Sequence, residues 1–448
     1  MVADTLSLGQ IAGRPKGNNQ SGAKTPGVDN VIWRTDRQKL HAADHLNRRG
    51  YKPSPLRRLY IPKKNGKLRP LSIPTLHDRA TQALHALGLA PIAETLADSN
   101  SYGFRQGRRC ADALGQVHTV LARKCSAPWV LEGDIRACFD EMSQEWLLQH
   151  VPMDKQILRQ WLKAGYWERG QLFPTSKGTP QGGIISPILA NLALDGMQEA
   201  IGQAVRRTGD KVNFVRYADD FIVTGATQEL LEQKVKPAVT AFLKERGLEL
   251  SEQKTVITSI QNGFNFLGHT VRKFEDKLLT FPAKSSVQAL RDKIRLCIQS
   301  ALGLSQEALI RKLNPLLQGW ANYYRHGAAK RTFQKLDYYL SDQLWRWIKR
   351  RHPNKSATWR KQKHFHRGAG CWNFSVPIRL ANGESKVLTL YRMASTTIQR
   401  HIKVRGKANP YDEQYTDYFE KRRYAIWRVR STGVDPDSRP ENRSHTAG

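Results

Sequence analysis

The sequence predicts an α+β fold in which antiparallel β-hairpins build the first part of the chain and helices the last part. Residues 51–74 and 214–223 each carry two β-favouring runs around a short turn, which is the pattern of a hairpin. Residues 309–317 and 333–348 instead repeat apolar side chains at helical spacing. The chain has 448 residues, 40% of them hydrophobic, which is enough for cores in about two to four domains.

A strongly basic composition indicates a polyanionic partner. The chain contains 72 Lys and Arg but 39 Asp and Glu, a formal net charge of +33. Such an excess is typical of proteins that bind nucleic acids. A membrane surface is the weaker alternative, because the sequence has no long apolar span and no lipidation signal. We therefore expect nucleic acid, and no membrane, among the partners.

The cysteines and the N-terminus favour a reducing compartment. The cysteines have no paired spacing that would predict a disulfide framework or a zinc ribbon. The first residues lack the apolar core of a secretion signal. These features predict a cytoplasmic protein, which in a bacterium would work in the cytoplasm or at the nucleoid. The five cysteines are Cys110, Cys125, Cys138, Cys297 and Cys371.

The first predicted hairpin, residues 51–74, turns at Asn65-Gly66, a typical hairpin dipeptide. Basic side chains surround this turn. One interpretation is a solvated basic loop, and the other is a finger that grips a triphosphate, since cationic donors neutralise charge in phosphoryl transfer. The basic residues are Lys63, Lys64, Lys67 and Arg69.

The second predicted hairpin carries two adjacent acids, Asp219 and Asp220, at its turn. Neighbouring carboxylates repel each other and so destabilise the turn, which calls for an explanation. Asp is a common turn residue, which is one explanation. The other is a site for divalent cations, since paired metal ions clamp the reacting oxygens in polymerases and nucleases. This second interpretation requires a third acid on a nearby strand, and Asp134 ends the apolar run 129–134.

Several sequence blocks, in order over roughly residues 55–270, resemble reverse transcriptases, in particular those encoded by group II introns. Each block alone is modest support, but the ordered set is specific. The blocks are the Asn65-Gly66 hairpin, Asp134, Pro180-Gln181-Gly182, Tyr217-Ala218-Asp219-Asp220 and Phe266-Leu267-Gly268.

This resemblance implies a right-hand polymerase, with fingers and palm built on antiparallel sheet and an α-helical thumb/maturase domain after them. It implies that Asp134, Asp219 and Asp220 are the catalytic acids. The same acids, together with Ile135, would bind two Mg²⁺ ions, for which Mn²⁺ could substitute. Phe139 would be the aromatic that crowds the nucleotide 2′ position. The implied nucleotide-binding residues are Lys63, Arg69, Phe139, Gln181 and Lys254.

The last part of the chain is the most basic. Residues 284–407 contain 26 Lys and Arg and five Asp and Glu, an excess of 21 that is most of the net charge. Residues 313–326 resemble the thumb, or domain X, of group II intron maturases, which retron and diversity-generating reverse transcriptases lack. The charges between its helices would contact RNA, although a solvated helix face is the alternative. The predicted RNA-binding residues are Arg325, Arg346, Lys349, Arg350 and Arg351.

These observations predict four regions. They are an N-terminal extension (1–50), reverse transcriptase fingers and palm (51–270), the thumb/maturase domain (284–407), and a DNA-binding-like segment with a polar tail and no endonuclease module (408–448). The expected function is an RNA-directed DNA polymerase that copies intron RNA for retrohoming and assists its splicing. The expected partners are group II intron RNA, an RNA template with a DNA primer, target DNA and dNTPs. The alternatives are a splicing-only maturase and a defence-associated reverse transcriptase.

Overall fold

The structure is a computed structural model that describes residues 24–46, 49–62, 66, 68–206, 209–368, 371–379 and 383–423. Within these ranges the chain forms two units, each described by itself below. The first unit contains the chain up to residue 120, residues 125–258 and residues 404–419. The second contains residues 121–124 and 259–403 and the chain from residue 420. The chain therefore returns to the first unit at residue 404.

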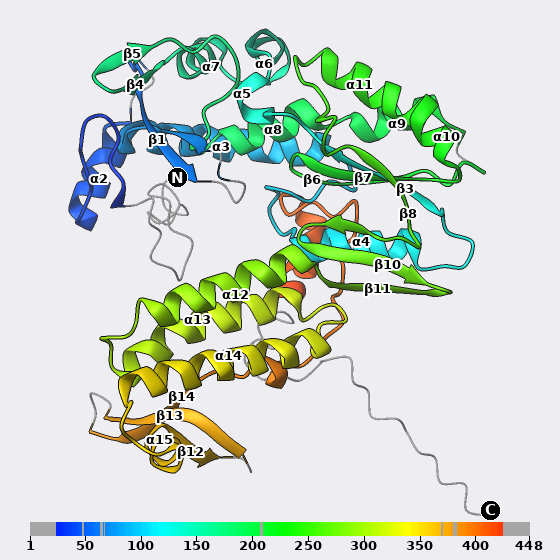
Figure 1. The fold of residues 1–448 in the computed structure, drawn as a ribbon. Helices are drawn as coiled ribbons and strands as arrows, with labels where there is room; N and C mark the ends of the chain where they lie inside the picture. Colours follow the sequence, from blue (N-terminus) through cyan, green and yellow to red (C-terminus); the bar gives the residue numbers. More distant parts are fainter. Residues whose placement is uncertain are drawn as a thin grey trace, which may run out of the picture. The chain divides into compact units, whose positions relative to one another are not determined.

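The centre of the first unit is a four-stranded sheet in the order β6-β7-β3-β8, in which β7 pairs antiparallel with both β6 and β3. Side chains of its strands, among them Leu131, Phe221 and Val223, pack into one hydrophobic core. Helices α8, α9 and α11 contribute to the same core and lie over one face of the sheet (Figure 1). The strands are β3 (Trp129–Asp134), β6 (Asn213–Tyr217), β7 (Asp220–Gly225) and β8 (Val256–Ser259), and the helices are α8 (Ser186–Leu194), α9 (Met197–Ala204) and α11 (Lys236–Lys244).

A second sheet of this unit contains the predicted basic hairpin. Strands β1 (Leu56–Pro62) and β2 (Leu68–Ile73) pair antiparallel, which confirms the hairpin. The sheet continues through β4 (Tyr166–Glu168) and β5 (Gln171–Phe173) in the order β2-β1-β4-β5. The remaining elements of the first unit are α2 (Asp36–Asp44), α3 (Leu76–Leu96), α4 (Cys110–Leu121), α5 (Cys138–Glu141), α6 (Gln144–His150), α7 (Lys155–Leu162), α10 (Gln228–Leu230), the π-helix η2 (Leu231–Val235) and the 3₁₀ turn η4 (Glu413–Tyr415).

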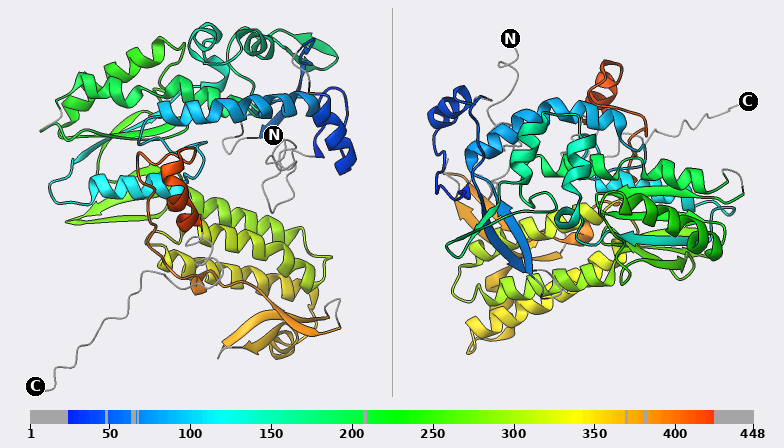
Figure 2. Two further views of the ribbon diagram at one scale, coloured as in Figure 1. Left: turned by 180° about the vertical axis from the view of Figure 1, so that it is seen from behind. Right: turned by 90° about the horizontal axis from the view of Figure 1, so that it is seen from above.

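The second unit is built on three long helices that lie side by side, as predicted for the thumb (Figure 2). Their apolar stripes form one core, from Leu290 through Leu313 to Trp347. A small sheet, β11-β10-β9, precedes them. The elements are β9 (Phe264–Phe266), β10 (His269–Phe274), β11 (Lys277–Pro282), α12 (Lys284–Gln299), α13 (Gln306–Tyr324), α14 (Lys330–Arg351), α15 (Ala357–His364) and the 3₁₀ turn η3 (Met393–Ser395).

A three-stranded sheet that the sequence patterns did not predict follows these helices. It contains β12 (Phe365–Gly368), β13 (Cys371–Arg379) and β14 (Ser385–Thr389) in the order β12-β13-β14. Phe365 and Phe374, which pair across this sheet, are buried in the same core as the helices. The helical bundle thus carries a β-sheet that closes one part of its core. Among the described helices, none is both long and apolar enough to cross a bilayer.

Candidate active site

Two neighbouring strands of the first unit bring three acids together. Asp134 ends β3 and lies directly opposite Asp220, the first residue of β7. Asp219 lies in the short turn between β6 and β7, because Tyr217 already pairs with Asp220. Residues opposite each other in antiparallel strands have Cβ atoms about 4.5–5.5 Å apart. The three carboxyl groups therefore meet at one edge of the sheet.

The turn that carries Asp219 is held by a neighbouring segment. Ala218 has a φ of +58°, a left-handed conformation that is uncommon for residues other than glycine. Gly103 packs so closely on it that a Cβ atom at Gly103 would clash with the Ala218 nitrogen. The Tyr102 N–H also donates to the Arg216 carbonyl at 2.9 Å. Residues 100–103 thus support the turn through Arg216, near the end of β6, and through Ala218.

A buried ion pair, which the sequence patterns did not predict, also supports the turn. The Arg216 side chain is fully buried and pairs with Asp195. Its Nη1 atom donates to the Ala218 carbonyl at 3.4 Å and to Asn191 Oδ1 at 3.3 Å. The signal that could have revealed it is a cation inside the apolar run 213–217. Buried cations need a partner, so such a residue predicts a paired network.

Burial and mutual repulsion perturb the acids. Burial, followed by the charges of Asp219 and Asp134, raises the pKa of Asp220 to about 6. Burial is also the main cause that raises the pKa of Asp219. Lys254 opposes both shifts, and its Nζ donates to Asp134 Oδ2 at 2.8 Å. Lys254 therefore offsets only part of the effect of burial and of the neighbouring acids.

The chemistry of this donor set fits Mg²⁺. Hard carboxylate oxygens are the ligands Mg²⁺ prefers, and a divalent cation would relieve the repulsion that raises the pKa of Asp220 after burial. The side chain of Ile135 is a hydrocarbon without a ligand atom, so its main-chain carbonyl is the only group it could offer a cation. Among the described residues no three His, Cys, Asp or Glu side chains are already arranged to hold a metal ion. Lys254 instead occupies one oxygen of Asp134.

The loop around Pro180 packs against the short helix that carries Phe139. The Thr179 N–H donates to the Phe139 carbonyl at 2.7 Å, and Gln181 Nε2 donates to Asp140 Oδ2 at 3.5 Å. The Phe139 ring meets Phe104 edge to face with ring centroids 6.4 Å apart. Helix α5 begins four residues after β3 ends, so Phe139 follows Asp134 closely in the chain, and the roles of Phe139 and Gln181 stay predictions.

Arg69, on the β1–β2 hairpin, is within electrostatic reach of the same acids. Burial raises the pKa of Asp219, and the Arg69 guanidinium is among the charges that oppose this shift. Arg69 lies opposite Ile61 in the register of the hairpin and is exposed. Lys63 lies outside the described residues, so its place in the site stays a prediction.

The predicted RNA-binding residues of the second unit differ in their contacts with other protein groups and in their exposure. Arg351 Nη1 donates to the Leu304 carbonyl at 2.6 Å, which ties the end of α14 to the loop before α13. Arg346 pairs with an acid one helical turn earlier, at 3.1 Å. Arg325 is half-buried at the end of α13. Lys349 and Arg350 are exposed in the last turn of α14.

Comparison with known proteins gives two family matches. The family described as "Reverse transcriptase (RNA-dependent DNA polymerase)" matches residues 61–271. The family described as "Group II intron, maturase-specific domain" matches residues 287–365. These ranges cover the acidic site of the first unit and the helices of the second, respectively.

Individual relatives agree with these matches. Protein YkfC of Escherichia coli is 31% identical over an alignment 341 positions long that covers 64% of this chain and 89% of that protein. Group II intron-encoded protein LtrA of Lactococcus lactis is 28% identical over an alignment 465 positions long that covers 82% of this chain and 76% of that protein. Among solved structures, a telomerase from Candida albicans matches with a TM-score of 0.41 at 13% identity, over 69% of this chain and 63% of that one.

These matches confirm the predicted resemblance, the right-hand polymerase fold with its helical domain, and reverse transcription combined with assistance to splicing. They do not favour the splicing-only or defence-associated alternatives. The chain belongs to the family of reverse transcriptases and maturases that group II introns encode.

Proposed function

We propose that Asp134, Asp219 and Asp220 carry the polymerisation reaction of this reverse transcriptase, in which a DNA primer is extended on an RNA template. The observation that carries this proposal is the register of β3 with β7, which sets Asp134 against Asp220 beside the turn of Asp219. Three acids at one sheet edge destabilise the fold unless they serve a ligand. A protein that only binds RNA has no need for three acids in one place.

The proposed cofactors are two Mg²⁺ ions, with Mn²⁺ able to substitute. The three acids and the carbonyl of Ile135 would hold them. Bound there, the metal ions would stabilise negative charge on the attacking and leaving oxygens of the phosphoryl transfer. The chain's own part is to hold the carboxylates in place through the supported turn. Lys254, which already donates to Asp134, adds a positive charge beside the site.

The incoming dNTP is proposed to lie between the acids and the Phe139 ring. Arg69 and Lys63 of the hairpin would neutralise its phosphates, and Gln181 would contact the nucleotide or the template. Phe139 would crowd the 2′ position of the sugar, which favours deoxynucleotides. Two observations support this placement. The charge of Arg69 opposes the rise in the pKa of Asp219, and the loop that contains Gln181 packs on the main chain of Phe139.

The proposed partners extend beyond the intron RNA itself. They are the RNA template with its DNA primer, dNTPs, and the target DNA into which an intron copy is inserted. The excess of positive charge in residues 284–407 supports the nucleic-acid partners. The cysteine pattern supports a cytoplasmic location, where thiols stay reduced.

Primer extension on an RNA template with Mg²⁺ tests the assignment of the acids. Asp134→Asn and Asp219→Asn should each lower single-nucleotide extension by at least about 1,000-fold, because each loses a ligand charge on which metal-assisted phosphoryl transfer depends. RNA affinity should change little, since the basic surface is untouched. Asp276→Asn, an exposed acid of the second unit that pairs with Lys124, is the matched control and should extend normally. Near-normal extension by either site variant would contradict the assignment.

A further inference from the structure

The segment that returns to the first unit, residues 404–419, docks on the loop that contains Phe104. The Val404 N–H donates to the buried Asp112 at 2.7 Å. Arg108 Nη2 donates to the Gly406 carbonyl at 2.9 Å. The ring of Phe419 fills the space beside Gly107, where an added Cβ would lie 2.7 Å from it. This returning segment is therefore packed into the polymerase unit, about 300 residues away in sequence from the loop it holds.

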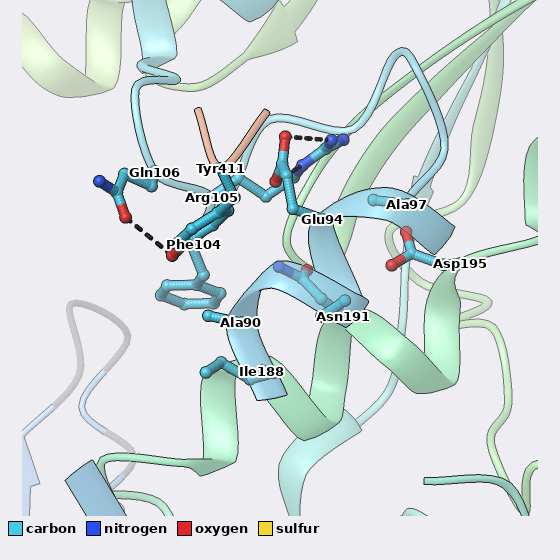
Figure 3. Close-up of a pocket in the computed structure, with 11 residues that line it drawn as sticks. Ala90, Glu94, Ala97, Phe104, Arg105, Gln106, Ile188, Asn191, Asp195 and Tyr411 are labelled. Carbon is cyan, nitrogen blue, oxygen red and sulfur yellow. Dashed lines mark hydrogen bonds and ion pairs between the residues drawn. The ribbon is translucent and has the colours of Figure 1, made fainter. Parts of the chain in front are cut away.

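The returning segment also completes a cavity of about 370 Å³ (Figure 3). Tyr411 lines it, and its hydroxyl donates to Gln106 Oε1 at 2.8 Å. The Phe104 ring lies beside Ala90 in this view, and Ile188 of α8 closes the same end. A volume of this size is at the lower end for a site that encloses a small organic group. The cavity thus has two aromatic walls on an apolar floor.

The charged residues around this cavity are already neutralised. Glu94 accepts from Arg105 through two bonds of 2.7 Å and also faces Arg108. Asp195, at the other end, pairs with the buried Arg216. A phosphate would find no unpaired cation among these lining residues, and a cation no unpaired acid. The lining therefore suits a flat, uncharged group.

The two rings are accessible to such a group. Phe104 is 54% exposed and Tyr411 is 40% exposed, although both line the cavity. Phe104 holds a φ of +57°, a strained conformation for a bulky residue, and such strain concentrates at functional sites. The strain presents the ring at the cavity rather than burying it in the core. Aromatic rings displayed in this way are stacking platforms for nucleobases, because every base offers a π-face.

The cavity lies next to the proposed active site. Phe104, on its wall, is the residue whose ring meets Phe139 at 6.4 Å. Asn191, also on its wall, donates to the Gly103 carbonyl at 2.9 Å and accepts from Arg216, which holds the Asp219 turn. A nucleic-acid strand that passes the acids would therefore reach the cavity within a short distance.

We propose that this cavity takes an unpaired base of the RNA template, stacked on Phe104 and Tyr411, and that the returning segment supplies this second ring. The proposal rests on the polymerase function proposed above. An incoming nucleotide does not fit the cavity, because its phosphates would need free cations there. A base of the single-stranded template brings a flat uncharged ring, while its phosphates stay outside. The returning segment then contributes directly to template binding by the polymerase unit.

The test uses the full chain with RNA–DNA primer duplexes whose template overhang contains 2-aminopurine at one of three successive positions. Stacking quenches this base, so we expect quenching on binding at one overhang position and not at all three. Tyr411→Ala and Phe104→Ala should abolish that quenching and weaken binding of the overhang duplex by about 5- to 150-fold, as the loss of one stacked base predicts. Tyr411→Phe keeps the ring and should keep the quenching.

Two controls separate stacking from a loss of structure. Tyr415→Ala removes a ring of the same segment that packs on Tyr418, and should leave the quenching unchanged. An abasic nucleotide at the quenched position should weaken binding to the wild-type chain to the same degree, without any substitution in the protein.

Three results would be decisive against the proposal or its premise. Equal quenching in wild type and Tyr411→Ala on duplexes that both bind would overturn the template-base site. Equally strong binding of a free 2-aminopurine nucleotide without template would make the cavity a nucleotide site instead. Failure of the wild-type chain to extend these primers would overturn the polymerase function, whereas position-specific quenching would still be measurable.

Discussion

At the scale of single residues, the proposed active site combines carboxyl groups that repel one another with a few cations that attract them. Burial and the neighbouring acids raise the pKa of Asp220 to about 6. Lys254 contacts Asp134 directly, and Arg69 acts on Asp219 from the hairpin. Apart from the adjacent Asp219 and Asp220, these side chains come from different parts of the sequence, so their chemistry depends on the fold that assembles them.

The selection of the sugar is predicted to depend on one residue, Phe139. Phe139→Ala should lower the preference for dATP over ATP by about 10- to 100-fold, because a crowding ring that excludes one hydroxyl supplies discrimination of this order. The measurement is the ratio of single-nucleotide incorporation rates for the two substrates. Phe173→Ala, a partly exposed ring on β5, is the control and should keep the wild-type ratio. An unchanged ratio in Phe139→Ala would remove this residue from the selecting role.

At the scale of elements, the β6–β7 hairpin depends on partners that surround its turn. Asn100 and Tyr102 bond the main chain of Arg216 in β6, and the buried Arg216 side chain, which pairs with Asp195, donates to the Ala218 carbonyl. The pair is buried, so its desolvation offsets much of its attraction. We infer that it positions the turn more than it stabilises the fold.

Arg216→Met alone is predicted to lower the free energy of unfolding by about 3–5 kcal/mol, because it leaves Asp195 buried and unpaired. Replacing both residues, by Arg216→Met with Asp195→Leu, should recover most of that loss. Primer extension should stay low in the double variant, because no donor then holds the Ala218 carbonyl. Urea unfolding and single-nucleotide extension of the same preparations measure the two effects.

The exposed pair Lys236–Glu232 provides the control for this experiment. Neutralising both residues should change stability by no more than about 0.5 kcal/mol, as for other exposed helix pairs, and should leave extension intact. Recovery of extension together with stability in the buried double variant would show that the pair has no positioning role.

At the scale of the whole molecule, acids and positive charge lie in different parts of the chain. The three acids belong to the first unit, whereas the excess of 21 positive charges lies in residues 284–407, most of which belong to the second. Catalysis and the binding of intron RNA should therefore respond to different substitutions. Arg351 is left out of this test, because its side chain already donates to the Leu304 carbonyl and its loss would also change the fold.

Neutralising Arg346, Lys349 and Arg350 together to Gln should make the plot of log affinity for intron RNA against log salt shallower by roughly 2–3, if all three contact phosphate. Single-nucleotide extension on a short duplex should change less, because the acids are untouched. A matched triple on the first unit, Lys163, Lys234 and Lys244, should alter the slope less. An unchanged slope, or an equal loss of both activities, would exclude a separable RNA-binding surface on α14.

The sequence was sufficient for whatever depends on local pattern. Runs of β-favouring residues around a turn predicted both hairpins. Helical periodicity over residues 309–317 and 333–348 predicted α13 and α14, because burial along a helix repeats at a fixed period. The ordered motifs were enough to identify the family and to nominate the acids. The β12–β14 sheet could not be predicted in this way, because its two buried Phe residues, Phe365 and Phe374, also fit a helical core.

Only the tertiary structure decided which distant residues meet. The sequence by itself determined both hairpins, two long helices of the second unit and the family, and it nominated the three acids. It did not determine that Arg216 pairs with Asp195, or that Tyr411 reaches Gln106 across about 300 residues. Such contacts have no period and no fixed spacing, because they arise from the packing of whole elements against one another. For the same reason the cavity between α3, α8 and the returning segment became visible only when the chain was folded.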